Sequence, residues 1–218
     1  MPLKHTPIDA RLADYVSRHH SNDGDPLIAE LRAETATAAG ELARMQVGEE
    51  QATLLGILAA ASGARRAIEI GTFTGASSIA IARAIGPEGT LLCCDVSSEW
   101  TDIARRYWSR AGVSDRIELR IGPAIETLKG LPADAEFDFA FIDADKTGYE
   151  SYYESLLPRM KAGSLILFDN ALQHGRVVEP ADDNSRAIVA LNARLARDAR
   201  VECALLTVAD GIMLCRKL

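Results

Sequence analysis

Short apolar runs alternate with helix-like stretches over most of this chain, and that alternation restricts the folds open to it. The runs are, in order, Ala67–Ile70, Thr90–Asp95, Ile117–Ile121, Phe137–Ile142, Ser164–Phe168, Val201–Leu206 and Ile212–Cys215. Helices are expected between them, near residues 75–85, 98–111, 123–130, 148–160 and 184–198. Strands that alternate with helices favour an α/β fold, in which a mostly parallel sheet is covered on both faces.

The two ends of the chain depart from this alternation. The last two runs are joined through the short turn at Ala209-Asp210-Gly211, which leaves no room for a parallel crossover, so these strands are expected to pair antiparallel. Before the first run, helices are expected at 8–20, 26–45 and Glu49–Ser62, with a turn at Ser21–Pro26 between the first two. We therefore expect a Rossmann-like sheet with a C-terminal antiparallel hairpin and extra N-terminal helices.

Composition limits the partners that this chain can have. Its 218 residues, 48% of them hydrophobic, are enough for one sizeable core. A formal net charge of −7 without a basic run argues against binding to nucleic acid or to an anionic membrane surface. No apolar stretch reaches the roughly 18 residues of a membrane span, and Met1–Thr6 lacks the apolar core of a signal peptide. We expect a cytoplasmic protein.

A glycine turn follows the first apolar run. Gly71 and Gly75 would let the backbone approach a ligand, and a helix that opens near Ser77 would offer free N–H groups. The alternative is an ordinary strand-to-helix turn. A dinucleotide fingerprint would need glycine at position 73, where Phe73 stands, and Glu69 suits a cationic ligand better than a phosphate.

The next two runs also end in residues suited to a nucleoside. Asp95 lies 24 residues after Gly71, where an acidic side chain can accept both hydrogen bonds of a ribose diol. Dinucleotide and adenosyl cofactors share this feature, and a solvated carboxylate at a strand end is the alternative. Gly122-Pro123-Ala124 follows the third run and is either an ordinary turn or a backbone platform for an adenine ring.

Two apolar runs stop at carboxylates. Asp143 follows Phe137–Ile142, and Asp169-Asn170 follows Ser164–Phe168. Strand-end carboxylates can be purely structural. Two adjacent strand ends would, however, bring together two carboxylates and an amide oxygen, an all-oxygen set suited to a hard divalent cation.

In combination, these motifs resemble the cation-dependent O-methyltransferases of the caffeoyl-CoA and catechol O-methyltransferase group. The matching segments are Glu-Ile-Gly-Thr-Phe-Thr-Gly at 69–75, Phe-Ile-Asp-Ala-Asp-Lys at 141–146, Phe-Asp-Asn at 168–170, Gly-Arg-Val-Val at 175–178 and Asp-Gly-Ile at 210–212. The resemblance extends from about Met45 to the end. It implies a seven-stranded class I methyltransferase sheet in a single domain, with residues 1–45 as an N-terminal helical region for substrate or dimer contacts and 46–218 as the core that binds S-adenosylmethionine (SAM).

The resemblance also implies a reaction and a set of site residues. Family members transfer a methyl group from SAM to a hydroxyl of a vicinal diphenol, with Mg²⁺ or another divalent cation such as Ca²⁺ or Mn²⁺, and are commonly homodimers. By position, the metal ligands would be Asp143, Asp169 and Asn170. The cofactor site would comprise Val47, Glu69, Gly71, Thr72, Ser77, Asp95, Ala124 and Asp143.

Asp143 and Lys146 are the candidate catalytic residues. A phenol with a pKa of about 10 is a weak nucleophile at neutral pH, so its deprotonated form must be favoured. Lys146 lies three residues after Asp143 and would either take the phenol proton or stabilise the phenolate as a cation. The alternative for Lys146 is a surface pair with Asp145.

One position departs from the plant-type pattern. Gln173 stands where these relatives often carry a tryptophan that forms a wall for the acceptor ring. An aromatic wall would then come from elsewhere, for example from Tyr149, Tyr152 or Tyr153, each of which can equally be a core residue of its helix. No compact Lys/Arg cluster is present for the phosphates of coenzyme A.

Three other functions fit parts of the pattern. A metal-independent small-molecule methyltransferase would need only the cofactor residues. An NAD(P)-dependent oxidoreductase would share the sheet, but Phe73 and the terminal hairpin argue against it. A non-catalytic adenosyl-binding protein would not need the set of Asp143, Asp169 and Asn170.

Overall fold

We examined a computed structural model of the chain, which describes residues 6–21 and 24–218. Two residues of the predicted turn at Ser21–Pro26 and most of the Met1–Thr6 segment lie outside this range. Within the described residues, no helix combines the length and the apolar character that a membrane crossing requires.

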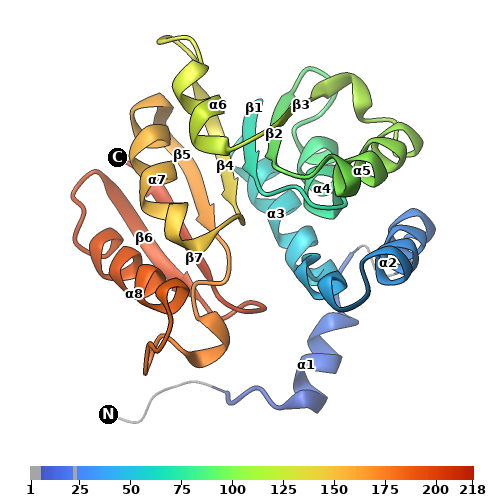
Figure 1. Cartoon of the computed structure of the whole chain (residues 1–218), viewed down its shortest axis with the longest axis horizontal. Coiled ribbons are helices and arrows are strands. Elements are labelled where there is room, and N and C mark those ends of the chain that lie inside the picture. Colours follow the sequence, from blue (N-terminus) through green and yellow to red (C-terminus); the bar gives the residue numbers. More distant parts are fainter. Residues whose placement is uncertain (1–5, 22–23) are drawn as a thin grey trace.

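The strands form one seven-stranded sheet, as the resemblance implied (Figure 1). They are β1 Arg66–Ile70, β2 Thr90–Asp95, β3 Ile117–Ile121, β4 Phe137–Ile142, β5 Met160–Phe168, β6 Val201–Leu206 and β7 Ile212–Lys217. Their order across the sheet is β3-β2-β1-β4-β5-β7-β6. The pairs from β3 to β5 are parallel, whereas β7 runs antiparallel to both of its neighbours. The predicted hairpin is confirmed.

The helices follow the predicted positions, with larger differences at the ends of two of them. They are α1 Ala10–Ser17, α2 Pro26–Ala39, α3 Glu49–Ala61, α4 Ala76–Ala84, α5 Ser98–Arg110, α6 Ala124–Gly130, α7 Tyr149–Leu156 and α8 Asp183–Leu195. The helix predicted over 26–45 ends earlier, because Gly40 takes a φ of 54° and a 3₁₀ segment, Gly40–Met45, follows it. The helix predicted over 148–160 also ends early, in a 3₁₀ turn that contains Pro158.

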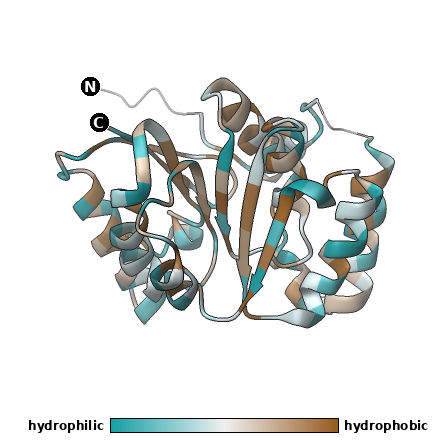
Figure 2. Ribbon diagram, turned by 90° about the horizontal axis from the view of Figure 1, so that it is seen from above, coloured by the Kyte–Doolittle hydropathy of each residue, from teal (hydrophilic) through white to brown (hydrophobic). Residues whose placement is uncertain are grey.

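Alternate side chains along each central strand point to opposite faces of the sheet and enter two separate cores. Ile68 and Ile70 pack with residues of α6, α7 and α8, whereas Ala67 and Phe139 pack with residues of α3, α4 and α5. Figure 2 shows the hydrophobic strands between helices on both sides. The central strands are therefore apolar on both faces, and polar groups are left to gather at the strand ends.

The strand order reverses between β1 and β4. From β1 the chain proceeds outward through β2 and β3, and it then returns to place β4 on the other side of β1. In open α/β sheets, ligands bind at the carboxyl ends of the strands beside such a switch point. Gly71 follows β1 and Asp143 follows β4, so both lie at this point.

Candidate functional site

The predicted site residues after β1, β4 and β5 meet at one edge of the sheet. The Asp143 N–H donates to the carbonyl of Ile70 at 2.7 Å, and the Asp169 N–H donates to the carbonyl of Ile142 at 3.0 Å. Gly71 has a φ of 93°, and a Cβ on it would lie 2.3 Å from the Asp143 carbonyl oxygen. Only glycine fits there, for both conformation and space.

Lys146 lies beside Asp143 rather than on the surface. Its Nζ donates to Asp143 Oδ1 at 2.9 Å and to the Tyr149 hydroxyl at 2.7 Å. The Lys146 side chain is 15% exposed. The alternative partner, Asp145, instead accepts from the Tyr152 hydroxyl at 2.5 Å. The surface-pair interpretation of Lys146 is thus wrong.

Asp169 and Asn170 form the second half of this edge. Asp169 is buried, and Asn170 turns the chain at a φ of 53° while its N–H donates to Asp169 Oδ1 at 2.7 Å. The Asn170 amide nitrogen donates to Asp210 Oδ2 at 3.3 Å. Because Asp210 takes the nitrogen, the amide oxygen of Asn170 remains available as an acceptor.

Asp210 was not predicted to act in the site. It lies in the turn between β6 and β7, and its backbone carbonyl accepts from Leu172 N–H at 2.9 Å. Gly211 likewise accepts from Ala171 N–H at 2.9 Å. The hairpin turn is therefore joined to the loop after β5, an association that only the antiparallel pairing of β7 with β5 creates.

The two carboxylates are strongly perturbed by their surroundings. Burial raises the pKa of Asp143 to about 7, the charge of Asp169 adds to the rise, and Lys146 opposes it. Burial also raises the pKa of Asp169, against the opposing effect of the Gln51 side-chain amide. Gln51, a buried residue of α3, is a second neighbour that sequence reasoning missed. A buried and a partly buried carboxylate beside one ammonium leave an excess of negative charge.

The donor set is small by the standard of metal-binding clusters. Within the described range, no group of three or more His, Cys, Asp or Glu side chains is arranged to hold a metal. The predicted set contains two such residues and one amide. His174 stands outside this set: its side chain is 75% exposed, and its Nδ1 lies 3.6 Å from Asp210 Oδ1.

Asp95 organises the glycine turn. Its Oδ2 accepts from the backbone N–H groups of Thr72 at 2.9 Å and Phe73 at 2.8 Å, and its Oδ1 accepts from Ser97 N–H at 2.8 Å. Phe73 itself adopts a φ of 50°. A carboxylate has about four acceptor positions, so Asp95 keeps one for a ligand and is not a freely solvated acid.

The second glycine of the turn packs against α5. Gly75 has a φ of 89°, and a Cβ on it would lie 2.8 Å from both Ala104 Cβ and Trp108 Nε1. Both neighbours belong to α5. Packing against α5 thus already requires glycine at position 75, and the approach of a ligand there stays a prediction.

Glu69 lies beneath the turn. Its side chain is fully buried, Cys93 Sγ donates to its Oε2 at 3.4 Å, and its Oε1 finds no hydrogen-bond partner among the described residues. Burial raises the pKa of Glu69 to about 7, while the hydroxyls of Ser77 and Thr72 act in the opposite direction. Glu69 therefore supports the turn from below, and a direct contact with the cofactor stays a prediction.

The remaining predicted cofactor residues lie in the turn after β1, at the starts of α4 and α6, and before α3. Thr72 and Ser77 are buried in the turn and the first turn of α4, and Ala124 is the buried first residue of α6. Val47 precedes α3 and lines a cavity of about 340 Å³ along α3 and α4. Among the described residues that line this cavity, Val47 is the one that was predicted for the site.

The possible aromatic walls belong to the core instead. Tyr149, Tyr152 and Tyr153 are all buried on α7. Gln173 is also buried, and its amide nitrogen donates to the Asn170 carbonyl at 3.1 Å. Gln173 thus closes the loop after β5.

Comparison with known proteins agrees with this geometry. The O-methyltransferase family model matches residues 18–218. A Dictyostelium discoideum protein named probable caffeoyl-CoA O-methyltransferase 2 is 46% identical over 175 residues, which are 78% of this chain and 76% of that protein.

Two solved structures are similar over most of their length. The O-methyltransferase from Bacillus cereus in complex with SAH has a TM-score of 0.86 and 30% identity, over 95% of this chain and 97% of that one. The O-methyltransferase TomG from Streptomyces achromogenes, in complex with SAM, has a TM-score of 0.78 and 30% identity, over 86% and 89%. The oxidoreductase alternative is wrong. The chain belongs to the O-methyltransferase family, and it is a SAM-dependent O-methyltransferase of the caffeoyl-CoA O-methyltransferase type.

Proposed function

We propose that this enzyme depends on a divalent metal and methylates one hydroxyl of a small aromatic acceptor with two adjacent hydroxyls. The observation that carries the proposal is the meeting of Asp143, Asp169 and Asn170 at the switch point, with the ammonium of Lys146 beside them. A methyltransferase that needed only SAM would have no use for two carboxylates buried together with one cation.

The donor set fits a hard cation. Asp143 and Asp169 offer carboxylate oxygens, and the contact with Asp210 leaves the Asn170 amide oxygen free. These are the ligand types that Mg²⁺, Mn²⁺ and Ca²⁺ prefer. A divalent cation bound there would lower the pKa of an acceptor phenol and fix its orientation.

The neighbouring turn fits the methyl donor. The remaining acceptor position of Asp95 suits a ribose hydroxyl, and Ser77 and Ala124 lie in the first turns of α4 and α6, where N–H groups are free of helical partners. When bound, SAM supplies an electrophilic methyl group on a sulfonium. Gly71 fixes the spacing between this turn and Asp143, and we assign Val47, just before α3, to the same cofactor site.

Lys146 is the residue that we assign to the acceptor oxygen. Its Nζ is held by two partners and carries three N–H groups, so one N–H remains for the acceptor. As an ammonium, Lys146 donates this N–H to the phenolate oxygen; as the neutral amine, it would instead accept the phenol proton. Its partial burial makes either interaction stronger than in water.

For the acceptor we propose a small catechol rather than a coenzyme A thioester. The arginines that follow the loop after β5 are already paired with acids. Arg176 lies 3.6 Å from Asp182, and Arg186 lies 2.8 Å from Asp183. Coenzyme A phosphates would compete with these carboxylates for the guanidinium groups.

We further propose that the enzyme acts in the cytoplasm as a homodimer, without a nucleic acid or membrane partner. The net charge of −7 supports the last point. For the dimer, α1 offers a free surface: none of its residues, all within the described range, is buried, and Tyr15 and Val16 are 59% and 45% exposed. Sedimentation of the protein at micromolar concentration tests the dimer.

Removal of the metal tests the main proposal. The protein is dialysed against a chelator and assayed on a catechol with SAM, before and after Mg²⁺, Mn²⁺ or Ca²⁺ is restored. We expect turnover to fall at least about 100-fold without metal and to return with one of these ions. Undiminished turnover in the chelator would instead establish a metal-independent methyltransferase.

A further inference from the structure

Tyr149 contacts residues that follow two different strands, β4 and β5. It is the first residue of α7, and its side chain is fully buried. Its hydroxyl lies 2.7 Å from Lys146 Nζ and 3.3 Å from the backbone oxygen of Asp169. Lys146 Nζ also lies 4.9 Å from the centroid of the Tyr149 ring. One tyrosine thus contacts the lysine after β4 and the backbone after β5.

These contacts determine which hydrogen bond the Tyr149 hydroxyl donates and which it accepts. The Asp169 carbonyl can only accept, so the hydroxyl hydrogen is donated to it. The oxygen lone pairs are then left for Lys146, whose ammonium can only donate. Asp143 Oδ1 takes a second N–H of the same ammonium at 2.9 Å. Lys146 is therefore held from two sides.

We propose that Tyr149 is a positioning residue that holds Lys146 in place for methyl transfer. This inference rests on the proposed function, because it needs Lys146 to act on the acceptor oxygen. A lysine side chain has a flexible four-carbon stem, and ordering it costs conformational entropy. Tyr149 orders the ammonium before the acceptor arrives, and methyl transfer is sensitive to displacements of about 1 Å.

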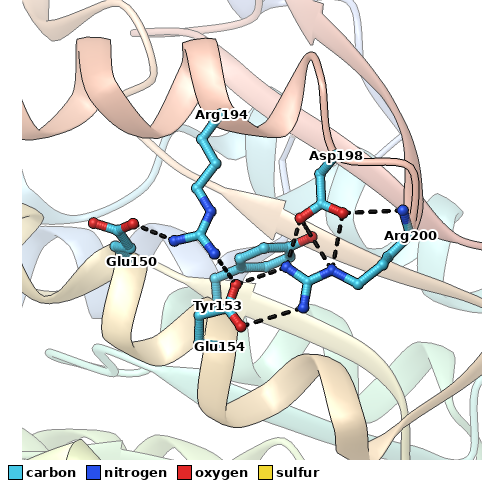
Figure 3. Close-up of polar contacts among 6 residues, drawn as sticks. All are labelled: Glu150, Tyr153, Glu154, Arg194, Asp198 and Arg200. Carbon is cyan, nitrogen blue, oxygen red and sulfur yellow. Dashed lines mark hydrogen bonds and ion pairs between the residues drawn. The ribbon is translucent and has the colours of Figure 1, made fainter.

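Tyr153 provides a matched control on the same helix. It is also fully buried, and the rings of Tyr149 and Tyr153 both pack on Phe168, with centroids 5.8 Å and 6.1 Å from it. The Tyr153 hydroxyl, however, donates to Asp198 Oδ2 at 3.0 Å, in the network of Figure 3. A change to phenylalanine removes one hydroxyl in either case, and only Tyr149→Phe removes a partner of Lys146.

A double-mutant cycle tests the inference. We would compare Tyr149→Phe, Lys146→Met, the double variant and Tyr153→Phe for kcat, KM of a catechol, and SAM affinity by calorimetry. We expect Tyr149→Phe to lower kcat about 10-fold, because the lost bond involves a charged group, while SAM affinity is kept. Tyr153→Phe should keep its kcat. In the Lys146→Met background, Tyr149→Phe should cause no further loss.

The possible failures are distinguishable. If Tyr149→Phe keeps the full kcat, or lowers it by the same factor with and without Lys146, then Tyr149 does not act through Lys146 and the inference is overturned. If Lys146→Met itself keeps the full kcat, the role of Lys146 in the proposed function is wrong, and the role of Tyr149 is overturned with it. Retained SAM affinity in every variant separates these outcomes from a failure to fold.

Discussion

Two clusters of carboxylates adjoin α7, and each leaves one negative charge unbalanced. In the surface network of Figure 3, the three carboxylates of Glu150, Glu154 and Asp198 meet the two guanidinium groups of Arg194 and Arg200. In the buried site, the two carboxylates of Asp143 and Asp169 meet the one ammonium of Lys146. In both clusters, these side chains therefore carry a net formal charge of minus one.

The pKa values nevertheless move in opposite directions. Hydrogen bonds from Arg200 lower the pKa of both Asp198 and Glu154. In the buried site, burial raises the pKa of both Asp143 and Asp169. The difference lies in the donors: several N–H groups of two guanidiniums serve the carboxylates of the surface network, whereas Asp143 and Asp169 share one ammonium, which does not offset their loss of water.

Of the changes that test this comparison, removal of a buried carboxylate should have the largest effect on turnover. We expect Asp169→Ala to lower metal-dependent turnover by about 10³-fold, because the cation loses a ligand while the methyl donor keeps its own contacts. Calorimetry should show nearly unchanged SAM affinity. Glu150→Ala, the matched change in the surface network, should leave turnover unaltered. Turnover of Asp169→Ala close to that of the unaltered enzyme would contradict the metal assignment.

Glu69 is a further buried carboxylate, and among the described residues it forms no ion pair with a cation. Its folded-state pKa of about 7 lies above the ordinary value of 4.5, so its protonated form stabilises the fold at low pH and this stabilisation is lost as pH rises through 7. Linkage gives roughly 3 kcal/mol between pH 4 and pH 8. Urea unfolding of the ligand-free protein should show that Glu69→Gln gains about this much relative to the unaltered protein over that range. Parallel pH profiles of the two proteins would rule out the raised pKa.

The smallest effect is expected in the surface network. Arg200→Ala removes partners of Asp198 and Glu154, yet the Arg200 side chain is 47% exposed and ion pairs of exposed groups contribute little, so we expect only a small loss of stability. The pKa of Asp198 is shifted down, whereas that of Glu69 is shifted up. The stabilisation by ionised Asp198 is therefore present above the ordinary pKa of the carboxyl and is lost as pH falls. Thermal unfolding and kcat measured together should show a small change in the former and none in the latter.

Much of the fold could be predicted because it depends on local sequence. The apolar runs match strands whose two faces are both covered, and the five-residue connection between β6 and β7 cannot span a parallel crossover. The ends of Phe137–Ile142 and Ser164–Phe168 likewise placed Asp143 and Asp169 at one edge, since parallel neighbours end together. Where a local breaker intervened, as at Gly40, the predicted helix was too long.

The rest of the site depends on contacts between distant segments. Nothing near Asp210 shows that β7 will pair with β5 and bring it to Asn170. The partner that requires glycine at position 75 is an α5 side chain some 30 residues later, Trp108. The burial of Tyr149 follows the helical pattern, but its hydroxyl contact with the Asp169 carbonyl depends on the loop after β5.

The missing side chain of Gly71 has a mechanical consequence. The carbonyl of Asp143 fills the space that a Cβ would occupy, so the turn after β1 and the loop after β4 are in direct contact. A shift of either segment therefore displaces the other. Under the proposed function, this contact sets the distance between methyl donor and acceptor, and a single methyl group at position 71 would push the two sites apart.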